Sequence, residues 1–297
     1  ASSTGGLASG SANMVSVSAR NLTIDGKGQS GGIRSSAFSG KPGKVAVVAE
    51  DDLVIRDTGL IAGGNLADLG VIEGLVGGQQ SSIRVQTGSA QIIGRGDGSL
   101  TGIVGQSDAK IDLEVKGHLA MTHGDIQTSA FGGVRSGDVT VTAGSISIAE
   151  GRGIHSTAEK GSTGDAGTVF VTATDGMLSI SGGGFIAANT WGQGNAGAVT
   201  VNAPSIRLED GGGIETAVKG TSTGSAGSLT VTARDLTINR GSAISSSNLT
   251  ERNTNGRAGD IIVLADRITV DAAGIGGTGI FSNAQCYGGY CSGGNVN

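Results

Sequence analysis

Short runs in which apolar and polar residues alternate recur along most of the chain. Each run begins at an apolar residue, and neighbouring starts are separated by 30, 38, 28, 28, 30, 30, 30 and 32 residues. Alternation predicts strands with one buried face, and a fixed long period indicates a structural repeat. The nine starts are Val15, Val45, Ile83, Ile111, Val139, Val169, Val199, Leu229 and Ile261.

Every unit contains the same three parts, which the unit beginning at Val199 illustrates. The alternating run "VTVNA" at 199–203 is followed by a corner, by a second alternation at Ile206 and Leu208, and by a Gly-bearing corner before Ile214. A polar loop ending in "GSAG" at 224–227 closes the unit. Three short strands with tight corners predict one turn of a parallel β-helix, in which equivalent residues of successive turns stack.

The pattern therefore predicts a single all-β solenoid over 1–297, with three-strand coils of about 30 residues and about nine rungs. At the usual strand spacing the rod would be on the order of 40–45 Å long. Residues 1–13 would form a partial first coil, and loop insertions are expected at 65–80, 247–259 and 282–295. The final letters, "GGNVN", resemble the start of a further coil, so we expect a segment of a longer rod.

Composition restricts the class of protein further. The chain contains 57 Gly, two Pro and eight aromatic residues (five Phe, two Tyr, one Trp), so its core must be aliphatic. The net charge of −5 and the absence of a Lys/Arg cluster argue against nucleic acid as a partner. No apolar run approaches the roughly 20 residues of a membrane span. The first residues, "ASSTGGLASG", do not resemble a signal peptide.

Two stretches carry a resemblance to a known family: "GNAGAVTVNAPSIRLEDGGGIETAVKG" at 194–220 and "GRAGDIIVLADRITVDAAGIGGTGIFSN" at 256–283. They resemble the repeats of filamentous-haemagglutinin-like exoproteins of two-partner secretion, over about residue 14 to the end and best from 138 onward. The resemblance implies a right-handed parallel β-helix that is exported through an outer-membrane transporter and acts as an adhesin. The Asn-Pro motifs of the family's secretion domain are missing, because Pro42 follows Lys41 and Pro204 follows Ala203.

Three groups of residues are candidates for contact or cross-linking. Arg95, Gly96 and Asp97 spell the tripeptide that integrins bind, in a loop that follows the run "QIIG". In a secreted chain with two cysteines, Cys286 and Cys291 are expected to form a local disulfide. Five residues after the third-strand apolar position, three units carry an aromatic residue that could contact a glycan or could simply cover the flank of the core: Phe38, Phe131 and Trp191.

The outward positions of the strands bear on two further activities, ice binding and polysaccharide cleavage. Threonine recurs on the first strand, as at Thr140 and Thr142, and flat threonine ladders can bind ice; Phe170, Asp112/Glu114, Ile262/Leu264 and Ala46/Val48 interrupt this one. β-helical polysaccharide enzymes need clustered carboxylates, whereas the outward position after each third-strand Ile carries unlike residues. That series is Gln127, His155, Ala187, Glu215 and Ser245.

The sequence thus predicts a stalk segment of a secreted or surface-attached bacterial adhesin, without enzymatic activity, metal or cofactor. The expected partners are a glycan or protein of a host or neighbouring cell surface, and the outer-membrane transporter that the resemblance implies. The main alternative is a filament subunit that polymerises end to end by pairing its open coils. A polysaccharide-active enzyme and an ice-binding protein are minor alternatives.

Overall fold

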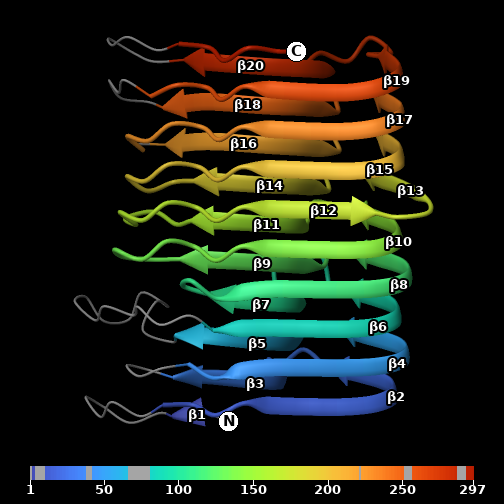
Figure 1. Ribbon diagram of the computed structural model, residues 1–297, viewed down its shortest axis with the longest axis vertical. Helices are drawn as coiled ribbons and strands as arrows, with labels where there is room; N and C mark the ends of the chain where they lie inside the picture. The colour runs from blue at the N-terminus through green and yellow to red at the C-terminus, as the bar shows by residue number, and fades with distance from the viewer. Residues whose placement is uncertain are drawn as a thin grey trace.

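The computed structural model describes residues 2–3, 11–37, 42–65, 81–220, 222–250, 256–285 and 292–297. All regular elements in these ranges are β-strands, stacked along one axis in two parallel sheets (Figure 1). The described part of the chain contains no helix that is long and apolar enough to cross a membrane.

One sheet, called here the long-strand sheet, contains the first and second strands of each coil. Its strands in spatial order are β2 (Val15–Asp25), β4 (Lys44–Arg56), β6 (Ser82–Ile93), β8 (Lys110–Thr122), β10 (Val139–Ala149), β12 (Val169–Ala173) with β13 (Met177–Ser181), β15 (Val199–Leu208), β17 (Leu229–Asn239) and β19 (Ile261–Asp271).

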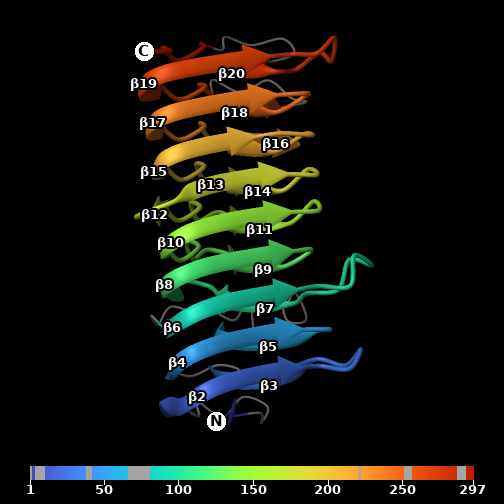
Figure 2. The same cartoon turned by 90° about the vertical axis from the view of Figure 1, so that its right-hand side faces the viewer.

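The other sheet, called the short-strand sheet, contains the third strand of each coil. Its strands in spatial order are β1 (Ser2–Ser3), β3 (Gly31–Ala37), β5 (Gly59–Asn65), β7 (Gly102–Gln106), β9 (Asp125–Ala130), β11 (Gly153–Ala158), β14 (Phe185–Thr190), β16 (Gly213–Gly220), β18 (Ala243–Thr250) and β20 (Gly279–Gln285). Figure 2 shows these strands stacked along the axis, with the connecting loops leaving at one edge.

The register confirms the predicted repeat. The nine predicted starts pair with one another in a single column from Val15 to Ile261 of the long-strand sheet. The predicted third-strand positions likewise form one column from Ile33 to Ile280. The fold is therefore a parallel β-helix of about 30 residues per coil, and its direction of winding stays a prediction.

The three expected strands appear as two elements in most coils. The corner between the first and second strands is so short that the backbone ladder continues through it, with register shifts at Ala49/Asp52, Thr87/Ala90 and Ala143/Ser145. Only β12 and β13 are separate, because four residues, 174–177, lie between the inward-facing Ala173 and Leu178. In this longer corner the backbone no longer pairs continuously with the neighbouring strands and forms a turn instead.

The core is a set of aliphatic columns that fill the space between the two sheets. Val141, Val171 and Val201 are each fully buried in one column, and Ile154, Ile186 and Ile214 are fully buried in the facing one. Each unit repeats the same apolar pattern because every coil must present the same surface to the coils above and below it.

A column of inward hydroxyls joins the short-strand sheet to the glycine that ends each loop. Ser246 Oγ donates to the Gly227 carbonyl oxygen at 3.0 Å and accepts from the Gly259 N–H at 2.8 Å. Ser156 Oγ makes the equivalent pair of bonds, to Gly137 and Gly167. These hydroxyls satisfy buried backbone groups where the two sheets converge.

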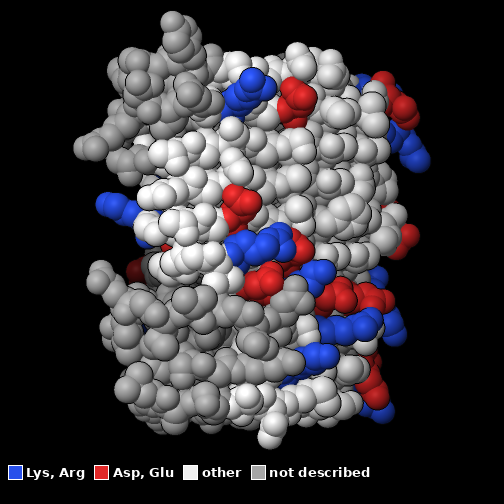
Figure 3. Space-filling view, turned by 60° about the vertical axis from the view of Figure 1, so that its left-hand side comes forward, with Lys and Arg blue, Asp and Glu red and all other residues white. Residues whose placement is uncertain are grey.

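Charge is distributed unevenly over the outer face of the long-strand sheet. Figure 3 shows Lys, Arg, Asp and Glu side chains gathered over the lower half of this side of the rod. They include the pairs Arg84–Asp112 at 3.8 Å and Lys110–Asp138 at 3.9 Å. The first-strand outward positions of the next four rungs carry no charged residue.

Candidate functional site

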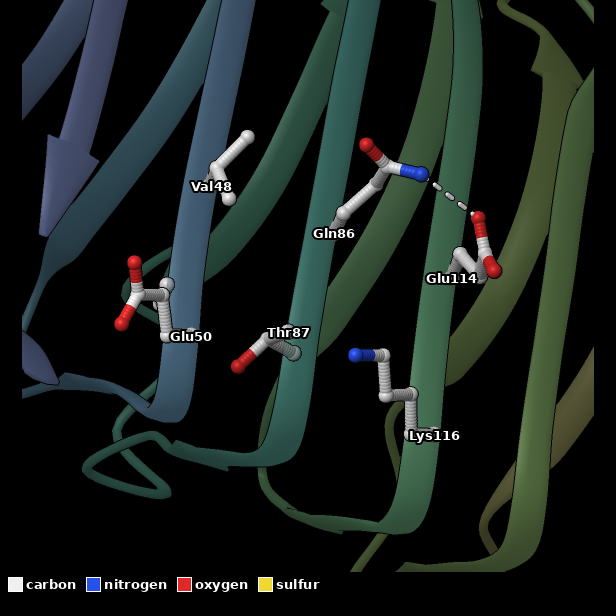
Figure 4. Close-up of a pocket in the computed structure, with 7 residues that line it drawn as sticks. Val48, Glu50, Gln86, Thr87, Glu114 and Lys116 are labelled. Atoms are coloured by element: carbon white, nitrogen blue, oxygen red, sulfur yellow. Dashed lines mark hydrogen bonds between the residues drawn. The ribbon is translucent and has the colours of Figure 1, made fainter. Parts of the chain in front are cut away.

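A hollow of about 200 Å³ opens on the outer face of the long-strand sheet, over the corner of β6 (Figure 4). Glu50 lies on the β4 side of the hollow, and Lys116 on the β8 side extends toward Thr87. Val48, Gln86 and Glu114, one from each strand, share a row across it, since Val48 pairs with Gln86 and Gln86 with Glu114.

The hollow exists because the corner of β6 is one residue shorter than its neighbours. Two residues separate the inward Thr87 and Ala90, whereas three separate Ala49 from Leu53 in β4 and Val115 from Leu119 in β8. The shorter corner contains Gly88, where a Cβ atom would lie 2.4 Å from the Asp51 carbonyl oxygen. Residue 88 therefore contributes no side chain to the space between Glu50 and Lys116.

The charged walls of the hollow are free to interact with solvent or a ligand. Neither the Glu50 carboxylate nor the Lys116 ammonium forms an ion pair or hydrogen bond with another described residue. Gln86 Nε2 donates to Glu114 Oε2 at 2.7 Å, which fixes the upper wall. The arrangement offers one ammonium group, two carboxylates and an amide carbonyl within a shallow space, and one of the carboxylates, that of Glu114, is already bound by Gln86. Sequence reasoning missed this hollow, although unequal corners in "AEDDL", "TGSA" and "VKGHL" were its signal.

The Arg-Gly-Asp tripeptide lies on an exposed loop, between β6 and β7, but its two charged side chains are engaged. Arg95 Nε binds Asp97 Oδ2 at 2.9 Å, and Arg95 Nη1 binds Asp57 Oδ1 at 2.8 Å. Hydrogen bonds from the Ser99 side chain and backbone lower the pKa of Asp97 to about 2. A receptor that binds the Arg95 and Asp97 side chains at separate sites would have to break the ion pair between them first.

The aromatic residues predicted to share a column occupy different settings. Trp191 is 43% exposed, and the ammonium of Lys219 lies 5.9 Å from the centroid of an indole ring. The Trp191 ring also packs against Gly220, where a Cβ atom would lie 3.4 Å from Cε3. Phe131 is half-buried two rungs away, and Phe38 lies outside the described residues. Part of the Trp191 surface thus covers the adjacent rung.

A buried acid that sequence reasoning missed lies at the start of β9. Asp125 is fully buried, and its Oδ2 accepts from Arg152 Nη1 at 2.9 Å. Arg152 Nη2 also donates to the Gly98 carbonyl oxygen at 2.6 Å, so this pair anchors the loop that carries the tripeptide. His155 Nε2 lies 3.5 Å from Asp125 Oδ1, which has no hydrogen-bond partner in the described structure. Asp125 occupies a column that holds Gly102 and Gly153 in the neighbouring rungs. A carboxylate in a column of glycines was the sequence signal that could have revealed this buried acid.

The outward column that contains His155 and Glu215 has the order expected from the sequence. Ala187 lies between them in the ladder, with Gln127 below His155 and Ser245 above Glu215. Glu215 Oε1 accepts from Asn189 Nδ2 at 2.7 Å and from Lys219 Nζ at 2.8 Å. Glu215 is therefore engaged within its own rung and the rung below.

Two other expectations concern cysteine and metal chemistry. Cys286 and Cys291 lie outside the described residues, so their disulfide stays a prediction. Within the described ranges, His, Asp and Glu do not form a group of three that could hold a metal ion.

Comparison with known proteins adds no relative. No protein-family model matches the chain, and no significant match was found among curated proteins or solved structures.

Proposed function

We propose that this chain is a stalk segment of a large extracellular adhesin, in which a rigid rod holds contact loops away from a bacterial surface. The observation that supports this role most directly is the continuous strand pairing in both sheets. Each rung is bound to its neighbours through two parallel ladders, from Val15 to Ile261 and from Ile33 to Ile280. Such a stack resists bending because the backbone hydrogen bonds between its strands run roughly along its axis.

The distribution of loops supports the same role. The described polar loops at 131–138, 159–168 and 191–198 leave one edge of the stack, and the loop at 94–101 projects separately from the corner before β7 (Figures 1 and 2). Contacts repeated along a stiff rod give binding through multivalency without a deep pocket. The proposed partners are a glycan or protein of a host or neighbouring cell, and export would use an outer-membrane transporter of two-partner secretion.

The proposal is tested by coating beads with the purified chain and measuring their attachment to a panel of bacterial and animal cells and to arrayed glycans. Retention above that of beads coated with an unrelated β-rich protein is expected. Asp97→Glu tests the tripeptide, with Asp271→Glu as an exposed control on another corner. Equal retention of both bead types on all surfaces would remove the adhesin proposal.

A second candidate, an end-to-end filament subunit, is favoured by one specific observation. Ile268 and Val270 of β19 are 46% and 49% exposed, although they continue the columns of Leu236 and Ile238, which are buried. An apolar strand surface of this kind can pair with another copy. Light scattering and electron microscopy over a concentration series distinguish the two: particles of fixed length support the stalk, and particles that lengthen with concentration support the filament.

A further inference from the structure

A regular array of small polar side chains covers the outer face of four consecutive rungs of the long-strand sheet. It occupies the two outward positions of the first strand in β10, β12, β15 and β17, which pair in continuous register. Seven of its eight positions carry threonine or asparagine, and the eighth carries phenylalanine. The members are Thr140, Thr142, Phe170, Thr172, Thr200, Asn202, Thr230 and Thr232.

The polar groups of this array are all free. None of the seven Thr and Asn side chains forms a hydrogen bond with another described residue, and all are partly or fully exposed. This contrasts with the inward hydroxyls, such as those of Ser156 and Ser246, which bind backbone groups of the core. The array therefore presents its hydroxyl and amide groups outward.

The backbone ladder sets the spacing of these groups. Neighbouring rungs lie roughly 4.8 Å apart, and alternate residues of one strand lie roughly 6.6 Å apart. Figure 1 shows the strands of this sheet stacked one above another, and the register keeps equivalent outward positions in two continuous columns. Threonine is restricted about χ1, which keeps each hydroxyl and methyl group in place before a ligand binds.

We propose that this face binds ice. A rigid array of free hydroxyls with two fixed repeats can hold water molecules in a lattice that continues into the crystal, while the threonine methyl groups cover the space between them. A ligand without a repeating structure can match only a few of these positions, whereas a crystal can form a favourable contact at every repeat of the array. Asp112 and Glu114 bound the array on one side and Ile262 and Leu264 on the other, so these two interruptions of the threonine pattern delimit a four-rung block.

Phe170 is the one defect of the array. It is 41% exposed and lies between Thr140 and Thr200 in the same column. Its ring projects beyond the neighbouring hydroxyls and keeps ice from its immediate neighbours. Phe170→Thr completes the eight positions without changing the inward side of β12, so it should strengthen binding if the array is the ice-binding surface.

The test measures partition of the fluorescently labelled chain into a slowly grown ice hemisphere, and inhibition of ice recrystallisation. Thr200→Lys/Thr230→Lys places two charged side chains on the array and should raise the inhibitory concentration by about tenfold or more. Thr237→Lys/Thr269→Lys adds the same charge to outward positions on the second strands of β17 and β19, outside the array, and should leave activity unchanged. Phe170→Thr should lower the inhibitory concentration.

Circular dichroism and thermal unfolding establish that each variant retains the fold. The proposal is overturned if the wild-type chain and Phe170→Thr are both excluded from ice like a soluble protein of similar size. It is equally overturned if the two Lys pairs have the same effect on recrystallisation. Neither readout involves cells or glycans, so the result is independent of the adhesin proposal.

Discussion

At the scale of single residues, the glycine that ends each loop is fixed by contact with the rung below. A Cβ atom on Gly227 would lie 1.9 Å from the Gly197 carbonyl oxygen, a distance at which the two rungs must separate. Gly227→Ala should lower the free energy of unfolding by about 1–3 kcal/mol through this overpacking. Urea unfolding followed by circular dichroism measures the change.

The matched control for that substitution is Gly276→Ala. No atom lies within 4 Å of the position of its Cβ, so the expected change is within about 0.5 kcal/mol. If the two variants unfold at the same urea concentration, the close stacking of the loop glycines does not exclude a larger residue at position 227.

The carboxyl of Asp97 provides a second prediction at this scale. Its pKa of about 2 follows first from the Ser99 side-chain hydrogen bond, then from the Ser99 N–H and Arg95. Because the folded pKa is depressed, the stabilisation is complete above the ordinary pKa near 3.9 and is lost as the pH falls through about 2. Ser99→Ala should move the ¹³C carboxyl titration of Asp97 upward, toward the ordinary value.

A titration of Asp97 that is the same in the wild-type chain and in Ser99→Ala would show that the loop does not hold this conformation in solution. The backbone bond from the Ser99 N–H to Asp97 Oδ1, at 2.9 Å, remains in the variant, so only part of the shift should disappear. Ser245→Ala, on the outward column of β18 and far from Asp97 in the stack, should leave the titration unchanged.

At the scale of elements, the length of a corner and the register of a strand tolerate change differently. Inserting one Ala between Thr87 and Gly88 gives β6 the three-residue corner that β4 and β8 already have. The fold should therefore survive with little loss of stability, and the hollow between Glu50 and Lys116 should be reduced. Thermal unfolding and a crystal structure of the variant are the measurements.

An insertion of one Ala after Val85 is the corresponding control within a paired strand. It would turn Thr87 and the rest of the first strand of β6 to the opposite face, because side chains alternate with a period of two. This variant should fail to fold cooperatively. Equal stability of the two insertions would contradict the assigned register.

The same distinction explains which elements the sequence predicted. Positions such as Val169 and Ile186 were found because every rung requires an aliphatic residue there, so the signal repeats. The number of residues in a corner is not fixed by the stacking in the same way, so it varies from rung to rung. The sequence therefore did not predict that the first and second strands merge, nor the hollow over Gly88. Asp125 and Arg152 were missed for another reason. They come from neighbouring rungs and meet at 2.9 Å, in positions that hold different residues in the other rungs.

At the scale of the whole molecule, the strand pairing of each described rung reaches only its neighbours. Stability of such a stack is approximately a sum of rung and interface contributions, so different regions can open separately. The interior columns are continuous and fully buried from Ile61 to Ile244, whereas Val263 and Ile280 in the last rung are partly exposed. Local opening should therefore become easier toward the ends of the stack.

Native-state hydrogen exchange tests this gradient. Amides of β11, β14 and β16 are bonded to rungs on both sides and should exchange most slowly, while those of β19 and β20 should exchange faster because one face lacks a complete partner rung. Ile148→Ala, in the middle of the stack, should accelerate exchange in its own and adjacent rungs and leave β2 unchanged. Uniform protection from β2 to β20, with a uniform response to the substitution, would mean that the rod unfolds as one cooperative unit rather than rung by rung.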